Sequence, residues 1–211
     1  LRMSRGLGDV YKRQVCAWID KVHAMHPDCT FSVETKIDGL SMSLRYAKEA
    51  DGKLHLQLAE TRGDGLIGED VTANARVIGD VLQVIDLPYD SLELRGEVYM
   101  SHDDFEKYNE EQERLEKKTA ANPRNLAAGT LRQLDTSITK KRGLEMFIFN
   151  VQDGPAEIME SHSKGMDILK AAGVPVVYHK ICKTKDEVVS AIDEILSLIH
   201  ISEPTRHAQI S

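Results

Sequence analysis

Long apolar runs, paired cysteines and a leader peptide are all missing from this chain of 211 residues. No stretch reaches the roughly 18 consecutive apolar residues that a membrane-spanning helix needs, and no apolar segment of a signal peptide follows the basic first residues. The three cysteines, Cys16, Cys29 and Cys182, are too scattered for a zinc site or a disulfide framework. These absences favour a cytoplasmic protein without a membrane partner and without a cysteine-bound metal.

The charge of the chain is acidic overall but unevenly distributed. The formal net charge is −7, with 41% hydrophobic and 29% charged residues, an ordinary balance for a soluble globular protein. Between Arg114 and Arg142, however, eight basic residues stand against two acidic ones. Salt screening confines the reach of each charge to about 8–10 Å, so this stretch can attract phosphates even on an acidic body. A solvated helix face has the same composition.

Hydrophobic periodicity predicts both helices and strands. We expect helices over residues 15–25, 69–78, 101–118, 122–134, 162–172 and 184–195. Thr184, with Glu187 three residues on, predicts a capping box at the start of the last of these helices. We expect strands over residues 31–37, 40–46, 54–58, 92–100, 146–151 and 174–178. Asp38-Gly39 is typical of a hairpin turn, so the first three strands are predicted to form an antiparallel meander.

A lysine lies at the end of the first predicted strand, in the segment Glu34–Gly39. Strand alternation places Glu34 and Lys36 on the same face. Burial or neighbouring cations can lower the pKa of a lysine held at a cleft, and its neutral amine can then attack an electrophile. Taken alone, the pattern is common, and a surface lysine before a hairpin turn explains it more simply.

Two further segments carry residues suited to a nucleotide. Thr61–Asp70 has the glycine spacing of neither a P-loop nor a dinucleotide fingerprint, which leaves Arg62 on a flexible backbone, suited to a phosphate or a ribose edge. In Arg95-Gly96-Glu97, a strand glycine lets another group approach the backbone closely. Glu97 can accept hydrogen bonds from ribose hydroxyls or hold a metal. The alternatives remain that Thr61–Asp70 is an ordinary loop and that Arg95-Gly96-Glu97 is part of an ordinary strand.

The fourth segment, Ala121–Asp135, contains Arg124 and Arg132. A helix would place these two arginines about two turns apart on nearly one face. The small residues between them would let that face lie close to a partner. A duplex backbone is the natural candidate.

In this order, the four segments together resemble the adenylation domain of bacterial NAD-dependent DNA ligases, over about residues 15–195. The resemblance implies an α+β fold: an antiparallel-sheet nucleotidyltransferase domain of the ATP-grasp-like ligase adenylation type with flanking helices, here incomplete. Lys36 would attack the α-phosphorus of NAD, expel nicotinamide mononucleotide and hold AMP as a phosphoramidate. AMP would pass to the 5′-phosphate of a DNA nick, and the 3′-hydroxyl would then displace it.

The resemblance also assigns roles in binding NAD. Glu34 is expected to contact the adenine, and Arg62 and Glu97 are expected to bind NAD, with Glu97 at the ribose. Phe149 falls where the family carries an aromatic ring, commonly a tyrosine, stacked on adenine. Phenylalanine keeps that stacking face and loses only the hydroxyl.

The remaining implications concern DNA, metal and location. Arg124 and Arg132 match arginines that contact nicked double-stranded DNA, and Mg²⁺ is implied because charge builds on the phosphates in each step. We expect a monomer in the bacterial cytoplasm, associated with the nucleoid. The family's N-terminal helical subdomain, a later Asp-Gly strand and lysine, and the four-cysteine zinc module do not appear in this sequence. We therefore expect the chain to be inactive in sealing and poor at self-adenylation.

The two ends of the sequence fit this pattern poorly. Residues 1–14 and 197–211 continue no periodicity of the body and resemble peptides translated from sequencing-adapter DNA. We expect both to be non-native, flanking a helical lead-in at 15–30 and a partial nucleotidyltransferase domain at 31–196. Finding these codons in an independent genomic read of the locus would contradict this expectation.

Two alternatives remain open. An ATP-dependent ligase or capping-type nucleotidyltransferase shares the lysine segment and the Arg-Gly-Glu strand but lacks the block Asn122–Asp135. A non-catalytic nucleic-acid-binding fragment would use only Arg124 and Arg132. Self-labelling by NAD, compared with ATP, separates all three interpretations.

Overall fold

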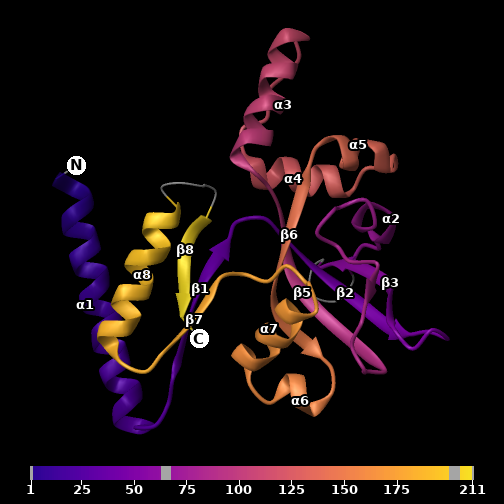
Figure 1. Cartoon of the computed structure of the whole chain (residues 1–211). Helices are drawn as coiled ribbons and strands as arrows, with labels where there is room; N and C mark the ends of the chain where they lie inside the picture. The colour runs from indigo at the N-terminus through magenta and orange to yellow at the C-terminus, as the bar shows by residue number, and fades with distance from the viewer. Residues whose placement is uncertain (1, 63–67, 200–204, 211) are drawn as a thin grey trace. The chain divides into compact units, whose positions relative to one another are not determined.

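The computed structural model describes residues 2–62, 68–199 and 205–210 (Figure 1). Its contacts divide the chain into two compact units, one of residues 1–36, 178–202 and 207–211, the other of residues 37–177 and 203–206. The boundary crosses strand β1 (Phe31–Ile37) directly after Lys36. None of the described helices is long and apolar enough to cross a membrane.

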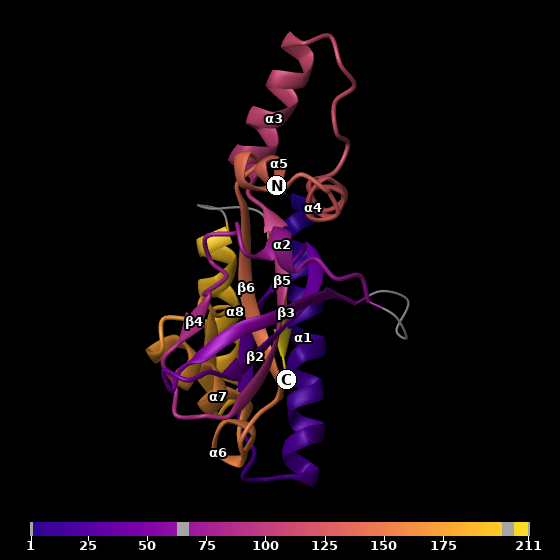
Figure 2. The same ribbon diagram turned by 90° about the vertical axis from the view of Figure 1, so that its right-hand side faces the viewer.

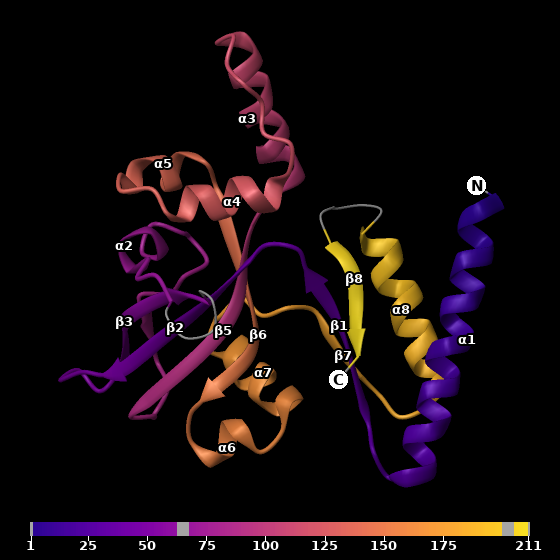
Figure 3. The ribbon, with the colours of Figure 1, turned by 180° about the vertical axis from the view of Figure 1, so that it is seen from behind.

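The first unit contains two helices and a three-stranded sheet. The sheet has the order β7-β1-β8, with β7 at His179–Cys182 and β8 at Thr205–Ile210. Helices α1 (Arg2–Met25) and α8 (Lys185–Ile199) run side by side in Figures 1 and 3. The buried core of this unit consists of Val15, Ile19, Phe31, Val33, Cys182, Val188, Ala191, Ile192 and Ile195.

Helix α8 begins with the capping box that the sequence predicts. The Thr184 hydroxyl oxygen accepts a hydrogen bond from the Glu187 amide at 3.2 Å, and the Glu187 carboxylate accepts one from the Thr184 amide at 3.2 Å. This carboxylate also accepts from the Lys183 amide, and these backbone hydrogen bonds lower the pKa of Glu187. The reciprocal bonds satisfy amides that the first turn would otherwise leave unpaired.

The second unit is built on a five-stranded antiparallel sheet with the order β4-β3-β2-β5-β6. The strands are β2 (Leu40–Lys48), β3 (Leu54–Thr61), β4 (Val84–Ile85), β5 (Ser91–Met100) and β6 (Leu144–Asp153). One face of this sheet is apolar, because every second residue of the central strands is buried in the main core, including Met42, Leu44, Leu94, Val98 and Met146.

Helices gather at the two ends of this sheet (Figures 1 and 2). At one end lie α3 (His102–Arg114), α4 (Pro123–Leu131) and α5 (Thr136–Lys141), and at the other lie α6 (Ala156–Met159) and α7 (His162–Ala171). Short helix α2 (Thr72–Ala75) follows β3. Ala127 and Leu131 of α4 and Met166 and Leu169 of α7 complete the core on the apolar face.

The predicted hairpin at Asp38-Gly39 is wrong. Strand β2 pairs with β3 and β5, whereas β1 pairs antiparallel with β7, so β1 and β2 belong to different sheets. Of the predicted three-stranded meander, only the β2–β3 hairpin is confirmed. Asp38-Gly39 is therefore a connection between two sheets.

Several predicted boundaries also differ. The helix expected over residues 69–78 is limited to Thr72–Ala75. Helix α3 ends at Arg114 because Glu116 adopts the left-handed conformation, with φ of 52°, and the Lys117 amide bonds back to the Gln112 carbonyl. Helix α4 ends at Leu131, before the predicted end at residue 134.

The strand expected over residues 174–178 is replaced by β7, one residue further on. Within 174–178, Val176 makes only an isolated parallel bridge with Ile148. The neighbouring Pro175 has no amide hydrogen to extend a ladder. Secondary structure also occurs where none was predicted. Helix α1 begins at Arg2, not at Val15, and the last segment contains strand β8.

Candidate nucleotide-binding site

Glu34 and Lys36 lie on β1, in the first unit, and share one strand face as predicted. They differ in burial: Glu34 is 5% exposed, whereas Lys36 is exposed. Glu34 accepts a hydrogen bond from the Ser32 hydroxyl at 2.6 Å, on the same face. Register with β7 fixes this strand, because Glu34 lies opposite His179 and the Thr35 amide donates to the Tyr178 carbonyl at 3.1 Å. The Lys36 amine is thus carried to the end of a well-paired strand and left accessible.

The Asp38-Gly39 connection, in the second unit, is held by two residues from distant segments. The Gly39 amide donates to the Glu97 carboxylate at 3.1 Å. Asp38 forms an ion pair with the Arg124 guanidinium at 3.3 Å. Three of the four sequence motifs therefore meet here: the lysine segment, the Arg-Gly-Glu strand and the Asn-Pro-Arg-Asn helix.

Glycine is required at two positions near this meeting point. A Cβ atom at Gly39 would lie 2.1 Å from the Val98 carbonyl oxygen, because β2 and β5 approach closely there. At Gly96, a Cβ atom would lie 2.5 Å from both the Phe147 carbonyl oxygen and the Met146 methyl group. The close approach predicted for Gly96 is confirmed, and the group that approaches is the neighbouring strand β6.

Phe149 belongs to an aromatic cluster on the second unit. Phe147 and Phe149 are partly buried and pack on buried Ile37, Tyr99 and Val177. The rings of Tyr99 and Phe147 stack with centroids 5.7 Å apart and an interplanar angle of 10°. This cluster offers a flat apolar surface of the kind on which a base stacks.

Tyr99 and Phe147 were not predicted as site residues, although strand alternation places both on the face that carries Glu97. The Tyr99 hydroxyl donates to the Glu145 carboxylate at 2.5 Å. Burial, and secondarily this bond to a carboxylate, raises the pKa of Tyr99. The hydroxyl therefore stays protonated and keeps the ring fixed in the cluster.

The same face of the five-stranded sheet is polar along β2 and β5. Ser41 lies opposite Glu97, and Ser43 lies opposite Arg95. Arg95 is partly buried, and its Nε atom is buried without a hydrogen-bond partner among the described residues. An arginine whose buried Nε–H has no partner among the described residues, two positions from Glu97, is suited to an oxygen-rich ligand. Arg95 was not predicted as a site residue, although it stands in the Arg-Gly-Glu motif.

Arg62 is exposed at the end of β3, where a loop begins. Residues 63–67, which include Gly63 and Gly65 of the predicted nucleotide segment Thr61–Asp70, lie outside the described residues. The base of the loop is closed by hydrogen bonds from the Thr61 amide to the Glu69 carbonyl and from the Glu69 amide to the Thr61 hydroxyl. Arg62 therefore directly follows a residue, Thr61, whose backbone and side chain are held by hydrogen bonds.

Arg124 and Arg132 mark the two ends of α4. Asn122 caps the helix by accepting a hydrogen bond from the Asn125 amide, Pro123 occupies its first turn, and Arg132 is the C-terminal cap. Both arginine side chains are about half exposed, at 55% and 47%. Arg132 pairs with Glu69, as Arg124 pairs with Asp38. A phosphate would have to compete with these carboxylates.

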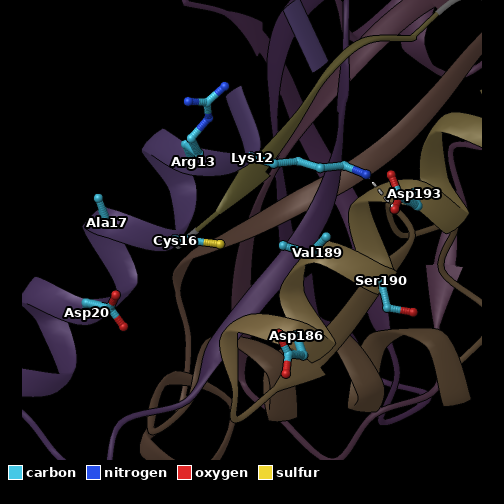
Figure 4. A pocket seen from close by; sticks show the side chains of 9 residues that line it. All are labelled: Lys12, Arg13, Cys16, Ala17, Asp20, Asp186, Val189, Ser190 and Asp193. Carbon is cyan, nitrogen blue, oxygen red and sulfur yellow. Dashed lines mark hydrogen bonds and ion pairs between the residues drawn. The ribbon is translucent and has the colours of Figure 1, made fainter. Parts of the chain in front are cut away.

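A cavity of about 680 Å³ lies elsewhere, between α1 and α8 of the first unit (Figure 4). It is lined by Lys12, Arg13, Cys16, Ala17, Asp20, Asp186, Val189, Ser190 and Asp193. Lys12 points across it and pairs with Asp193 at 2.8 Å. None of the predicted site residues lines this cavity.

The chain was compared with known proteins. The sequence profile of the NAD-dependent DNA ligase adenylation domain matches residues 3–201. The chain belongs to this family. The DNA ligase of Clostridium kluyveri is 44% identical over 191 residues, which cover 90% of this chain and 28% of the relative. The DNA ligase of Jannaschia sp. is 50% identical over 149 residues, which cover 71% and 19%. The chain thus spans less than a third of the length of these relatives.

Among solved structures, an archaeal ATP-dependent RNA ligase matches 87% of this chain and 39% of its own, with 17% identity and a TM-score of 0.43. A likeness this low does not bear on the choice of nucleotide. Membership of the family and the mixed helix and antiparallel-sheet architecture together confirm the predicted fold class of a nucleotidyltransferase-like adenylation domain. The predicted resemblance to NAD-dependent DNA ligases is confirmed as well.

A bound Mg²⁺ would depend on ligands supplied by the phosphates of the substrate. Among the described residues, no group of three His, Cys, Asp or Glu side chains could hold a metal ion. Mg²⁺ commonly binds through one or two carboxylates together with substrate phosphates. The described part of the chain thus contains no ready-made cage, and no step below depends on a metal.

Proposed function

We propose that this chain is the nucleotide-charging part of an NAD-dependent DNA ligase, with Lys36 as the nucleophile. The observation that carries the proposal is the meeting of three motifs at Asp38-Gly39, directly after this lysine. Glu97 holds the Gly39 amide and Arg124 holds Asp38, so residues brought from far along the sequence fix the backbone next to Lys36. An ordinary surface lysine before a turn would need no such support.

The chemistry is a transfer of AMP. The Lys36 amine attacks the α-phosphorus of NAD, a nitrogen–phosphorus bond forms, and the bond from that phosphorus to the bridging oxygen breaks. Nicotinamide mononucleotide leaves with the bond electrons, and the amine loses a proton. AMP then passes to the 5′-phosphate of nicked double-stranded DNA, and the 3′-hydroxyl displaces it. Mg²⁺, when bound to the phosphates, would offset their developing negative charge.

The residues on the second unit suit the dinucleotide. The exposed part of Phe149 offers a stacking face for adenine, and the Glu97 carboxylate can accept hydrogen bonds from ribose hydroxyls while one of its oxygens holds Gly39. Arg62 supplies a cation for the phosphates. On the first unit, buried Glu34 is proposed to contact the adenine. Arg124 and Arg132 are proposed to bind the phosphates of nicked DNA.

We also propose that the protein acts as a monomer in the bacterial cytoplasm, where DNA in the nucleoid is its substrate. The named relatives come from bacteria, and α4 and α5 with their C-terminal caps carry five of the eight basic residues in the basic stretch of an otherwise acidic chain. For the two ends, residues 1–14 and 197–211, the proposal of a non-native origin stands beside the finding that helices α1 and α8 extend into them.

The decisive experiment is intact-mass analysis of the purified chain after incubation with NAD and Mg²⁺, in parallel with ATP and Mg²⁺. We expect one AMP on a small fraction of the chain with NAD, none with ATP, and none on the Lys36→Ala variant. Lys48→Ala, which removes another exposed strand lysine, is the matched control and should label normally. Labelling by ATP instead would favour the ATP-dependent alternative, and labelling by neither nucleotide would contradict charging by this chain.

A further inference from the structure

Leu134 has the most exposed large hydrophobic side chain in the described part of the molecule. Its relative exposure is 103%, whereas Met25, the next, is 68% exposed. It follows α4 directly, two residues after Arg132. Single exposed apolar residues are common on protein surfaces, so exposure alone explains nothing.

What sets Leu134 apart is the rigidity of its neighbours. The Gln133 carbonyl accepts a hydrogen bond from the Asn74 amide group at 2.8 Å, and the Gln133 backbone amide donates to the Thr130 carbonyl at 3.1 Å. Asn74 is itself buried and bonded to Thr139. On the other side, the Asp135 carboxylate caps α5 by accepting from the Ser137 amide at 2.9 Å. The backbone on both sides of Leu134 is therefore held by hydrogen bonds, and the structure leaves the leucine side chain in water.

The surroundings of Leu134 indicate a nucleic acid and not a protein partner. Its chain neighbours Gln133 and Asp135 are polar, whereas a stable protein interface needs a wide, well-packed apolar centre. Positive charge lies on both sides along the chain, at Arg132 and at the α5 residues Lys140 and Lys141. Proteins that bind the minor groove combine basic residues with apolar side chains, leucine among them, that wedge between base steps.

We propose that Leu134 is an apolar contact of this chain with the minor groove of nicked duplex DNA, packed against the deoxyribose and base edges. This inference rests on the proposed function for the identity of the partner. Its physical signature differs from that of the arginines. A cation releases counterions when it meets a phosphate, whereas an apolar contact releases none.

The test is fluorescence anisotropy with a labelled nicked duplex across 50–200 mM salt, using the whole chain. For Leu134→Ala we expect about tenfold weaker binding at every salt concentration, with an unchanged slope of log K against log salt; tenfold corresponds to about 1.4 kcal/mol. For Arg132→Gln we expect the slope to fall by about 0.9. Leu115→Ala is the matched control, because Leu115 is 48% exposed at the C-terminal cap of α3, and it should bind as the unsubstituted chain does.

A conservative variant separates contact from fold. Leu134→Met keeps an apolar side chain of similar size and should retain affinity within about twofold, whereas Leu134→Asn should not. Unchanged binding by Leu134→Ala, or a loss accompanied by the slope change of Arg132→Gln, would overturn the proposal. Self-labelling by NAD should be the same in the Leu115→Ala control as in the unsubstituted chain. Failure of the unsubstituted chain to label, with the Leu134 effect intact, would overturn the charging activity alone.

Discussion

Lys36 and Gly39 belong to one short segment, yet the structure holds them in different ways. Lys36 is exposed at the end of a strand of the first unit, and its side chain makes no ion pair with any other described residue. Gly39, in the second unit, is buried, bonded to Glu97 and too close to Val98 to carry a side chain. The segment thus separates the proposed reacting group from its support. Changes at one position should affect chemistry, and changes at the other should affect the fold.

The largest expected effect is on chemistry alone. Lys36→Ala should abolish AMP labelling completely because no other amine takes its place. Its free energy of unfolding should stay within about 0.5 kcal/mol of the unsubstituted chain, as for most exposed residues. Mass analysis and urea denaturation measure the two quantities. A large loss of stability would show that Lys36 also supports the fold and would remove the contrast with Gly39.

Gly39→Ala should show the opposite pattern. The added methyl group would meet the Val98 carbonyl oxygen at 2.1 Å, so β2 and β5 must separate. We expect a destabilisation of about 1–3 kcal/mol, as for overpacked sites. Gly79→Ala is the matched control, because a Cβ atom there meets nothing within 4 Å. Equal urea midpoints for the two variants would show that the close approach is not needed.

Glu97 is expected to serve both the chemistry and the fold, and a conservative substitution should separate these two effects. Glu97→Gln retains an oxygen that can accept from the Gly39 amide, so stability should fall by less than about 1 kcal/mol. The loss of negative charge weakens the bond to a ribose hydroxyl, and we expect AMP labelling to slow by about tenfold. Glu93→Gln, on the same strand, provides the control. If both variants label at the normal rate, Glu97 serves the backbone only.

Replacing Arg124 should change stability only slightly. Its ion pair with Asp38 is exposed, so Arg124→Gln should cost at most about 1 kcal/mol. If Arg124 also meets a DNA phosphate, the salt slope of nicked-duplex binding should fall by about 0.9. Lys170→Gln, at an exposed position of α7, should leave the slope unchanged. An unchanged slope in Arg124→Gln would assign the arginine to Asp38 alone.

Features governed by adjacent residues were predicted well. The capping box at Thr184 and Glu187 and the end of α7 before Gly173, which adopts φ of 83°, depend only on local chemistry. The partner of β1 does not. Asp38-Gly39 favours a hairpin locally, but β1 finds its partner in β7, far along the chain, and no local pattern encodes that choice.

The candidate site shows the same limit. Composition and spacing selected Lys36, Glu97 and Arg124, while their roles came from resemblance to a family. The bonds that join Glu97 to Gly39 and Arg124 to Asp38 were not predicted, because separate motifs do not state which of them meet. Tyr99 and Arg95 could have been predicted, because alternation along β5 places them on the face of Glu97. The sequence does not show, however, which strands lie beside β5 and therefore which residues share that face.

The bonds at Asp38-Gly39 have a consequence for the order of synthesis. Glu97 lies 58 residues after Gly39, and Arg124 lies 86 residues after Asp38. A ribosome adding about 5–20 residues per second needs several seconds to deliver these partners after Lys36 has been made. During that interval the contacts with Glu97 and Arg124 cannot form. The proposed nucleophile therefore comes early in translation, and these two supports of its segment are added only when the later motifs emerge.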